Sequence, residues 1–334
     1  MSIWWFAFGY FACYVPYSAL TKAITQGMLG TAPPPSGFEL LPITVIASTL
    51  GMFALITLMG WWRYASRSEI LGRDIPHPGR WTFFSGLCTA AIIVTTTLAY
   101  SFSGVSIVFM MLIMRGGLLI LAPVVDALSG RSTRWFSWAG LLLSLGALLV
   151  AFSDKEGYEL TVVSAVDVTV YLASYFVRLR LMSNLAKSED PEDSWRYFVE
   201  EQIVASPAVL VVLALLALGD VGAVGHALRA GFTDIWGKDI LPHACAVGLL
   251  SQGTGVFGGL ILLSKQENTF CVPVNRSSSI MAGVVASLAL ALLYDNPMPS
   301  NAQLIGAGLI VGAIFFLTLP PMIERKRAQA ARDK

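Results

Sequence analysis

Charged residues are scarce in this sequence. Only 13% of its 334 residues are Asp, Glu, Lys or Arg, whereas a soluble globular protein carries roughly 25%. Folded in water, such a chain would leave much of its apolar surface uncovered, so the composition excludes a cytosolic enzyme and a disordered scaffold. The formal net charge of +1 provides no electrostatic basis for binding nucleic acid, which is therefore not an expected partner.

Patterns typical of metal sites and catalytic sites are missing as well. The four cysteines form no CxxC pair, and the three histidines are far apart in the sequence. The segment from Gly253 to Gly258 matches GxGxxG, but it lies inside an apolar run, where small residues favour close helix packing rather than nucleotide binding. We therefore expect no metal, no cofactor and no enzymatic activity.

Long apolar runs are abundant, since 55% of the residues are hydrophobic. A helix needs about 20 mostly apolar residues to cross a bilayer. The sequence predicts an all-α integral membrane protein with ten transmembrane helices, at residues 3–21, 38–62, 81–101, 104–128, 135–153, 161–182, 197–218, 240–264, 268–293 and 302–322. We expect the longest connections, 63–80 and 219–239, to be surface segments.

The distribution of basic residues predicts the orientation of these helices. The even-numbered loops and the carboxyl tail hold 15 Lys and Arg residues, from Arg63 to Lys334, whereas the odd-numbered loops hold only Lys22, Lys155, Arg229 and Lys238. Because cytoplasmic loops carry the excess of basic residues, both termini are expected in the cytoplasm. We expect a multi-pass protein of the plasma membrane, which is the inner membrane in a bacterium.

The two halves of the chain match each other at offsets of 158 to 166 residues. The matched segments are Tyr10–Tyr14 with Tyr171–Tyr175, Val45–Ser48 with Ile203–Ser206, Gly86-Leu87 with Gly248-Leu249, Arg115 with Arg276, and Gly140–Ala147 with Gly306–Ala313. Each half, 1–157 and 158–334, holds five expected helices, an odd number, so the two halves should be inverted relative to each other in the membrane. Inverted repeats are typical of transporters that bind their substrate near the midplane.

Two segments of the sequence resemble a known family. The stretch from Ala122 through Asp126, Gly130 and Arg131 to Gly146 is similar to the end of an EamA-type repeat, and so is the stretch from Ala282 to Gly312. Ten helices in two such repeats resemble the drug/metabolite transporter superfamily, which includes nucleotide-sugar and triose-phosphate carriers. The glutamate that usually precedes the last helix of each repeat is absent. The resemblance implies secondary transport through a central cavity.

Two arginines, Arg115 and Arg276, are expected deep inside helices, where a charge is costly. Asn275 and Ser279 accompany Arg276 and give its surroundings a small, polar character. Guanidinium offers paired donors in a plane that suit phosphate and carboxylate, so we predict that both arginines bind an anionic substrate. The alternative is that each arginine pairs internally, for instance with Glu200, Glu201 or Asp167.

Other polar residues in the expected helices are candidates for the same cavity. Tyr10 and Tyr14 lie too deep for the membrane interface, and Tyr171 matches Tyr10 in the sixth helix. Gln252 is a conspicuous neutral polar residue of the eighth helix. We predict that these four residues line the substrate site. Arg178 lies close to the cytoplasmic end of its helix, where we expect its side chain to reach the lipid headgroups.

Three acidic residues are candidates for coupling transport to protons: Glu201, Glu200 and Asp167. A buried carboxylate can carry a proton across a membrane, although these groups can equally balance the arginines or lie at the interface.

Taken with the repeat, these residues predict a secondary transporter for a small organic solute, which we expect to be an anion bearing phosphate or carboxylate. A proton-coupled exporter or flippase of amphipathic compounds, cations or lipids is the alternative, and an intramembrane enzyme is a weaker one. The expected partners are the solute and the lipid bilayer; a homodimer is left open.

Overall fold

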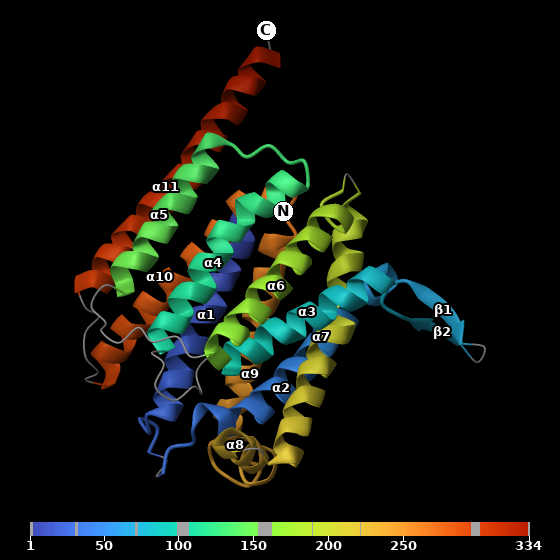
Figure 1. The fold of residues 1–334 in the computed structure, drawn as a ribbon, viewed down its shortest axis with the longest axis vertical. Helices are drawn as coiled ribbons and strands as arrows, with labels where there is room; N and C mark the ends of the chain where they lie inside the picture. Colours follow the sequence, from blue (N-terminus) through green and yellow to red (C-terminus); the bar gives the residue numbers. More distant parts are fainter. Residues whose placement is uncertain are drawn as a thin grey trace.

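The computed structural model describes residues 3–30, 33–70, 73–98, 107–152, 162–188, 190–220, 222–294 and 301–332 (Figure 1). Within these residues the chain forms a bundle of helices and one short hairpin. The helices are α1 (Ile3–Thr25), α2 (Gly37–Leu58), η1 (Trp61–Tyr64), α3 (Arg80–Leu98), α4 (Ile107–Leu128), α5 (Trp135–Phe152), α6 (Val162–Leu185), α7 (Pro191–Gly219), α8 (Gly222–Thr233), α9 (Leu241–Leu262), α10 (Asn268–Tyr294) and α11 (Asn301–Arg332). The prediction of an all-α protein is confirmed for these residues, apart from the hairpin.

A helix is present at each of the ten positions where the sequence predicts one. Five of them are long and apolar enough to be candidate membrane spans: α2, α6, α7, α9 and α10. The predicted boundary between the two halves, at 157/158, and the break between the predicted helices 81–101 and 104–128 lie outside the described residues.

Two elements appear in segments that the sequence predicts only as surface connections. The strands β1 (Arg67–Ile70) and β2 (Arg73–Pro76) pair antiparallel, with Ser68 opposite Ile75. The helix α8 follows α7 and packs against both α2 and α7. Figure 1 shows the hairpin projecting from one flank of the bundle, while α5 and α11 lie together on the opposite flank.

Polar side chains mark where several helices begin. Ser36 and Glu39 form a capping box at the start of α2, in which each side chain accepts a hydrogen bond from the other residue's backbone N–H (3.2 and 3.1 Å). Asp190 caps α7, which begins with Pro191. The cap of α10 is tertiary: the Asp126 carboxylate, from α4, accepts the backbone N–H groups of Asn268 and Thr269 at 2.8 and 2.7 Å.

The helices pack in two similar groups around the centre of the bundle. Helix α1 contacts α9 and α10, and α2 contacts α9; correspondingly, α6 contacts α3 and α4, and α7 contacts α3. Between the groups, α2 contacts α7, α4 contacts α10, and α5 contacts α11. Both ends of the described chain lie at the same end of the bundle in Figure 1, which we call the termini end.

Glycines permit the closest helix crossings. A Cβ atom at Gly248 of α9 would collide with the carbonyl oxygen of Thr44 in α2, and one at Gly86 of α3 would lie 2.5 Å from the Cβ atom of Val204 in α7. The matched glycines therefore lie at matched crossings, α2 with α9 and α7 with α3. By contrast, a Cβ atom at Gly255, also in α9, would have no neighbour within 4 Å.

We expect Gly248→Ala to lower the free energy of unfolding by about 1–3 kcal/mol, the usual range for overpacking, because the new methyl group forces α2 and α9 apart. Gly255→Ala is the matched control. It lies in the same helix with open space around it, and should be neutral or stabilising by up to about 1 kcal/mol through helix propensity. Thermal unfolding of the purified variants in detergent measures both. Equal stability of the two variants would contradict the close crossing.

Candidate functional site

Two arginine–tyrosine pairs lie where α1, α4, α6 and α10 meet. The Nη2 atom of Arg276 in α10 donates to the hydroxyl of Tyr175 in α6 at 2.9 Å. The Nη2 atom of Arg115 in α4 lies 3.5 Å from the hydroxyl of Tyr14 in α1, at the outer limit of a hydrogen bond. In both pairs the partners are 101 residues apart in the sequence. Each arginine is also the ninth residue of its helix.

Two further tyrosines complete this group. The rings of Tyr10 and Tyr14 stack with centroids 5.5 Å apart, and those of Tyr171 and Tyr175 meet edge to face at 4.9 Å. Both guanidinium groups act electrostatically on the hydroxyls of Tyr10 and Tyr171, so all six side chains lie in one neighbourhood. We call these residues the Tyr–Arg cluster: Tyr10, Tyr14, Arg115, Tyr171, Tyr175 and Arg276.

Sequence reasoning identified five of these six residues and omitted Tyr175 from the predicted site. The repeat itself contains the missing signal. Tyr14 and Tyr175 are 161 residues apart, as are Arg115 and Arg276. A partner found for one arginine therefore points to the partner of the other.

Arg276 has unused hydrogen-bonding capacity. Its Nε atom is buried and has no hydrogen-bond partner, and among the described residues Arg276 forms no ion pair. The Tyr175 ring, 5.6 Å from Cζ, offers a cation–π contact but no full charge. A buried guanidinium without a carboxylate is costly unless a ligand or water compensates it.

The two other polar residues predicted on α10 differ in their surroundings. Asn275 is 5% exposed, makes no hydrogen bond to a described residue, and has its amide nitrogen close to Gly258 beside the Tyr10 ring. Its amide is therefore available to a ligand next to the Tyr–Arg cluster. The Ser279 hydroxyl instead donates to the backbone carbonyl of Arg276 at 2.8 Å, within its own helix.

Gln252 makes its contacts outside this cluster. Its Oε1 atom accepts from the Ser48 hydroxyl at 2.8 Å, and its Nε2 atom lies 2.9 Å from the sulfur of Met52, so both partners belong to α2. Gln252 also lines an apolar cavity of about 570 Å³ that includes Trp61 and Trp195. Among the described residues, the hydrogen bonds of Gln252 thus go to α2 and not to the Tyr–Arg cluster.

Glu201 forms a buried ion pair with Arg178. Two nitrogens of Arg178 donate to the two carboxylate oxygens, each at 2.8 Å, and Ser85 and Thr89 donate to Oε1 at 2.6 and 3.1 Å. Arg178 is only 7% exposed, so the prediction that it reaches the lipid headgroups is wrong. The acceptor for its guanidinium is a carboxylate on the neighbouring helix.

Glu200, the adjacent residue, holds the hairpin segment against α7. Its carboxylate accepts the backbone N–H groups of Ser66 and Gly79 at 2.9 and 2.8 Å, and the Thr82 hydroxyl at 2.5 Å. Ser66 and Gly79 flank the hairpin on either side, so one carboxylate fixes both ends of that segment. Neither Glu200 nor Glu201 pairs with Arg276.

Asp167, the third acidic candidate, is also buried, at 6% exposed. Its Oδ2 atom has no hydrogen-bond partner, and no described residue forms an ion pair with it. Asp167 lies on α6 one helical turn before Tyr171 of the Tyr–Arg cluster.

A polar network joins several helices at the termini end. The Lys187 ammonium donates to the backbone carbonyl of Gln266 and to the Asn268 side chain at 2.8 and 2.9 Å. Arg131 donates to the backbone carbonyls of Lys265 and Ser183. These bonds connect the segments after α4 and α6 to the segment between α9 and α10.

Two ionisable groups of this network have shifted pKa values. Burial lowers the pKa of Lys187, and the charge of Arg131 acts in the same direction. Burial acts to raise the pKa of Glu267, but hydrogen bonds from Arg134 (3.0 Å) and Ser137 (2.6 Å) outweigh it and hold that pKa below its usual range.

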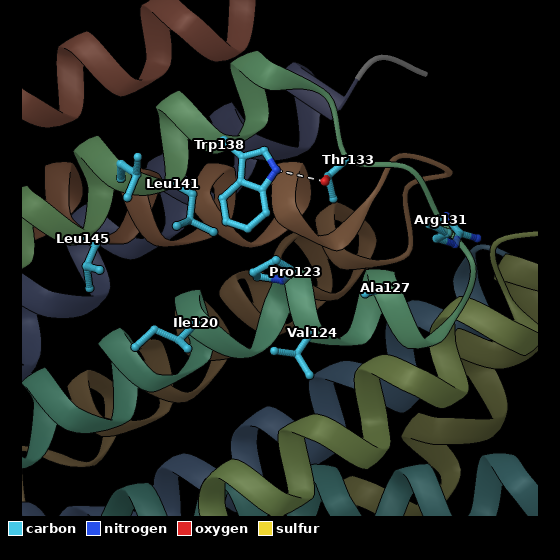
Figure 2. Close-up of a pocket in the computed structure, with 10 residues that line it drawn as sticks. Ile120, Pro123, Val124, Ala127, Arg131, Thr133, Trp138, Leu141 and Leu145 are labelled. Atoms are coloured by element: carbon cyan, nitrogen blue, oxygen red, sulfur yellow. Dashed lines mark hydrogen bonds between the residues drawn. The ribbon is translucent and has the colours of Figure 1, made fainter.

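A second apolar space lies between α4 and α5, on the flank of the bundle. Ile120, Pro123 and Val124 of α4 and Trp138, Leu141 and Leu145 of α5 line a groove of about 540 Å³. In Figure 2 the Trp138 ring lies over Pro123. Trp138 donates to the Thr133 hydroxyl at 2.9 Å, and Arg131 lies at one end. The groove contains no residue of the Tyr–Arg cluster. In the described part of the chain, no three His, Cys, Asp or Glu side chains gather as metal ligands would.

No protein-family model matches this chain, and no curated protein matches it. A solved structure, described only as the crystal structure of a protein, is similar over 94% of this chain and 95% of its own, with a TM-score of 0.55 and 16% sequence identity. At this identity the similarity concerns the fold alone: an experimentally observed chain has a comparable helix arrangement along nearly its whole length.

We expect Glu201→Gln to lower the free energy of unfolding by about 3–5 kcal/mol, because it leaves the Arg178 charge buried without its partner. Replacing both residues, as Arg178→Met with Glu201→Leu, removes the charge and the unpaired group together and should recover most of that loss. Thermal unfolding in detergent measures both variants. A double variant no more stable than Glu201→Gln would contradict this account of the pair.

Proposed function

We propose that this protein is a secondary membrane transporter that binds a small anionic solute at the Tyr–Arg cluster. Arg276 carries the proposal, because its guanidinium lies inside the bundle with a buried Nε atom that no described residue satisfies. Asn275 and the tyrosine hydroxyls supply neutral hydrogen-bonding groups beside it. A phosphate or carboxylate group placed there would receive the paired donors that the guanidinium offers.

The membrane setting is supported by the apolar surface of the bundle. Five helices are candidate spans by length and composition, and large apolar side chains such as Phe8, Leu142, Leu218 and Leu292 are exposed on several helices. In water such a surface would drive association, whereas in a bilayer it contacts lipid. We propose that all ten predicted helices cross the membrane, with both termini in the cytoplasm as the basic residues indicate.

The inverted repeat is supported by the helix–helix contacts, most of which are reproduced when each helix is replaced by its counterpart in the other half. Exchanging α1, α2, α3, α4 and α5 with α6, α7, α9, α10 and α11 converts the α1–α9, α1–α10 and α2–α9 contacts into the α6–α3, α6–α4 and α7–α3 contacts. It also converts the Tyr14–Arg115 pair into the Tyr175–Arg276 pair. We propose that the solute binds where the two halves meet, and that alternating access arises from their near equivalence.

The network at the termini end supports a conformational cycle. Hydrogen bonds from Lys187 and Arg131 link the segments after α4 and α6 to the segment before α10. These are bonds between short polar segments, so they can break and re-form at modest cost. We propose that they open when the site faces the cytoplasm.

The resemblance to EamA-type repeats is consistent with this function, and we propose membership of the drug/metabolite transporter superfamily. One observation favours a second candidate, a flippase for amphipathic compounds or lipids: the apolar groove between α4 and α5 opens on the flank of the bundle and has Arg131 at one end. The transporter of a small anion remains our proposal because Arg276 is the group whose charge requires a ligand.

We expect Arg276→Gln to weaken binding of an oxyanion at least about tenfold, since a hydrogen bond to a charged group contributes about 1.5–3 kcal/mol. Inorganic phosphate and succinate serve as probes, with affinity measured by calorimetry and melting temperature measured on the same samples. Arg229→Gln, an exposed arginine near Asp220, is the control and should bind as the wild type does. Unchanged affinity in a well-folded Arg276→Gln protein would contradict the anion site.

A further inference from the structure

Five acidic side chains are buried in the described residues: Asp126, Asp167, Glu200, Glu201 and Glu267. Four of them accept three or four hydrogen bonds each. Asp167 is the exception, since no described residue donates to its carboxylate and its Oδ2 atom is buried without a partner. A charge left in this state is expensive inside a membrane protein.

Among the described residues, no cation forms an ion pair with Asp167. On its own helix, Arg178 follows eleven residues later, about 16 Å along the axis, and is bound to Glu201.

The charged groups of the neighbouring helices also have other partners or lie elsewhere. Helix α3 packs against α6 and carries Arg80 and Cys88 towards the termini end, where Cys88 lies near Arg178 and Glu201. From α7, Tyr197, Glu200 and Glu201 belong to that same end. From α4, Asp126 caps α10, and Arg115 directs its Nη2 atom towards Tyr14.

The position of Asp167 links it to the anion site. Residues four apart lie on the same face of a helix, so Asp167 shares a face with Tyr171, and Tyr171 contacts Tyr175, which binds Arg276. An ionised Asp167 therefore adds an uncompensated negative charge close to a site that must accept an anion.

We propose that Asp167 binds a proton and that this proton is carried together with the anionic solute, so that the protein is a proton–anion symporter. The inference rests on the proposed function and assigns its driving ion. Binding converts the carboxylate into a neutral carboxylic acid, and release to the other side restores it. Because the neutral form removes a charge that repels the anion, proton and anion each favour the binding of the other, as linkage requires.

A proton fits this site better than a divalent metal cation. Cations such as Ca²⁺ and Mg²⁺ need several oxygen ligands around them. Asp167 is a single carboxylate, and in the part of the chain that is described it belongs to no group of three potential metal-ligating side chains. A proton requires only the one carboxylate.

Infrared difference spectroscopy of the purified protein tests the proton site without any solute. Between pH 8.0 and pH 5.5, the wild type should gain a carbonyl band of a protonated carboxyl group that is absent from Asp167→Asn. The control Asp220→Asn removes an exposed carboxylate at a position with positive φ, a conformation that Asn also tolerates, and should keep the band. A band that persists in Asp167→Asn, or is absent from the wild type, overturns the proton site.

Binding of inorganic sulfate tests the coupling, because the charge of sulfate does not change between pH 5.5 and 8.0. The wild type and Asp220→Asn should bind sulfate at least about fivefold more tightly at pH 5.5, the lower end of typical couplings between two sites. Asp167→Asn, a mimic of the protonated state, should bind with the tighter affinity at both pH values. The three histidines are the same in all three proteins, so the difference between the variants belongs to Asp167.

The outcomes separate this inference from the proposed function. Sulfate binding that is equally pH-dependent in Asp167→Asn, or that depends on sodium and not on pH, overturns proton coupling while the anion site stands. An absence of sulfate, phosphate and succinate binding at either pH, in protein that still shows the infrared band, overturns the proposed anion site and with it the symport, and leaves only a proton-binding group.

Discussion

A guanidinium group inside a helical bundle must be compensated, and the buried charges of this protein meet that requirement in two ways. Arg178 is matched completely: Glu201 accepts two of its hydrogen bonds, and Ser85 and Thr89 complete the carboxylate's coordination. Arg276 receives only a tyrosine hydroxyl and the face of its ring. The hydrogen bonds around Arg178 and Glu201 join α3, α6 and α7. The charge of Arg276 has no carboxylate partner among the described residues, so an anion bound there would compensate it.

The difference between the two arginines follows from their places in the repeat. Arg276 has a counterpart, Arg115, at an offset of 161 residues, whereas the residue at that offset from Arg178 is Tyr17. The paired charge is therefore a feature of one half, and the Tyr–Arg pairs are common to both. In the proposed transport cycle, a binding site built from features common to both halves can stay in place while the halves change their arrangement around it. The Arg178–Glu201 pair lies in the second half, and Ser85 and Thr89 of α3 join it from the first.

Hydropathy predicts where the helices lie because each apolar run is long and is interrupted by polar or glycine-rich segments. It does not predict α8 or the β1–β2 hairpin, which depend on tertiary contacts. The hairpin, for example, is held by Glu200, which binds Gly79 and Ser66 although they lie 121 and 134 positions earlier in the sequence. The site is predictable to a similar degree. Depth and repeat symmetry identify five of the six residues in the Tyr–Arg cluster. They do not give the direction a side chain faces, which is why Arg178 was expected at the headgroups.

The central claim, that two inverted halves carry an anion across a membrane, is tested most directly by counterflow in proteoliposomes. Vesicles containing the purified protein are preloaded with unlabelled glycerol 3-phosphate, phosphate or succinate, and uptake of the same labelled compound is followed over time. The account predicts transient, saturable accumulation of at least one of these anions above its equilibrium level, because a carrier exchanges internal for external solute. Uptake no greater than in protein-free vesicles for every anion that the protein binds, or a flux that does not saturate, would contradict it.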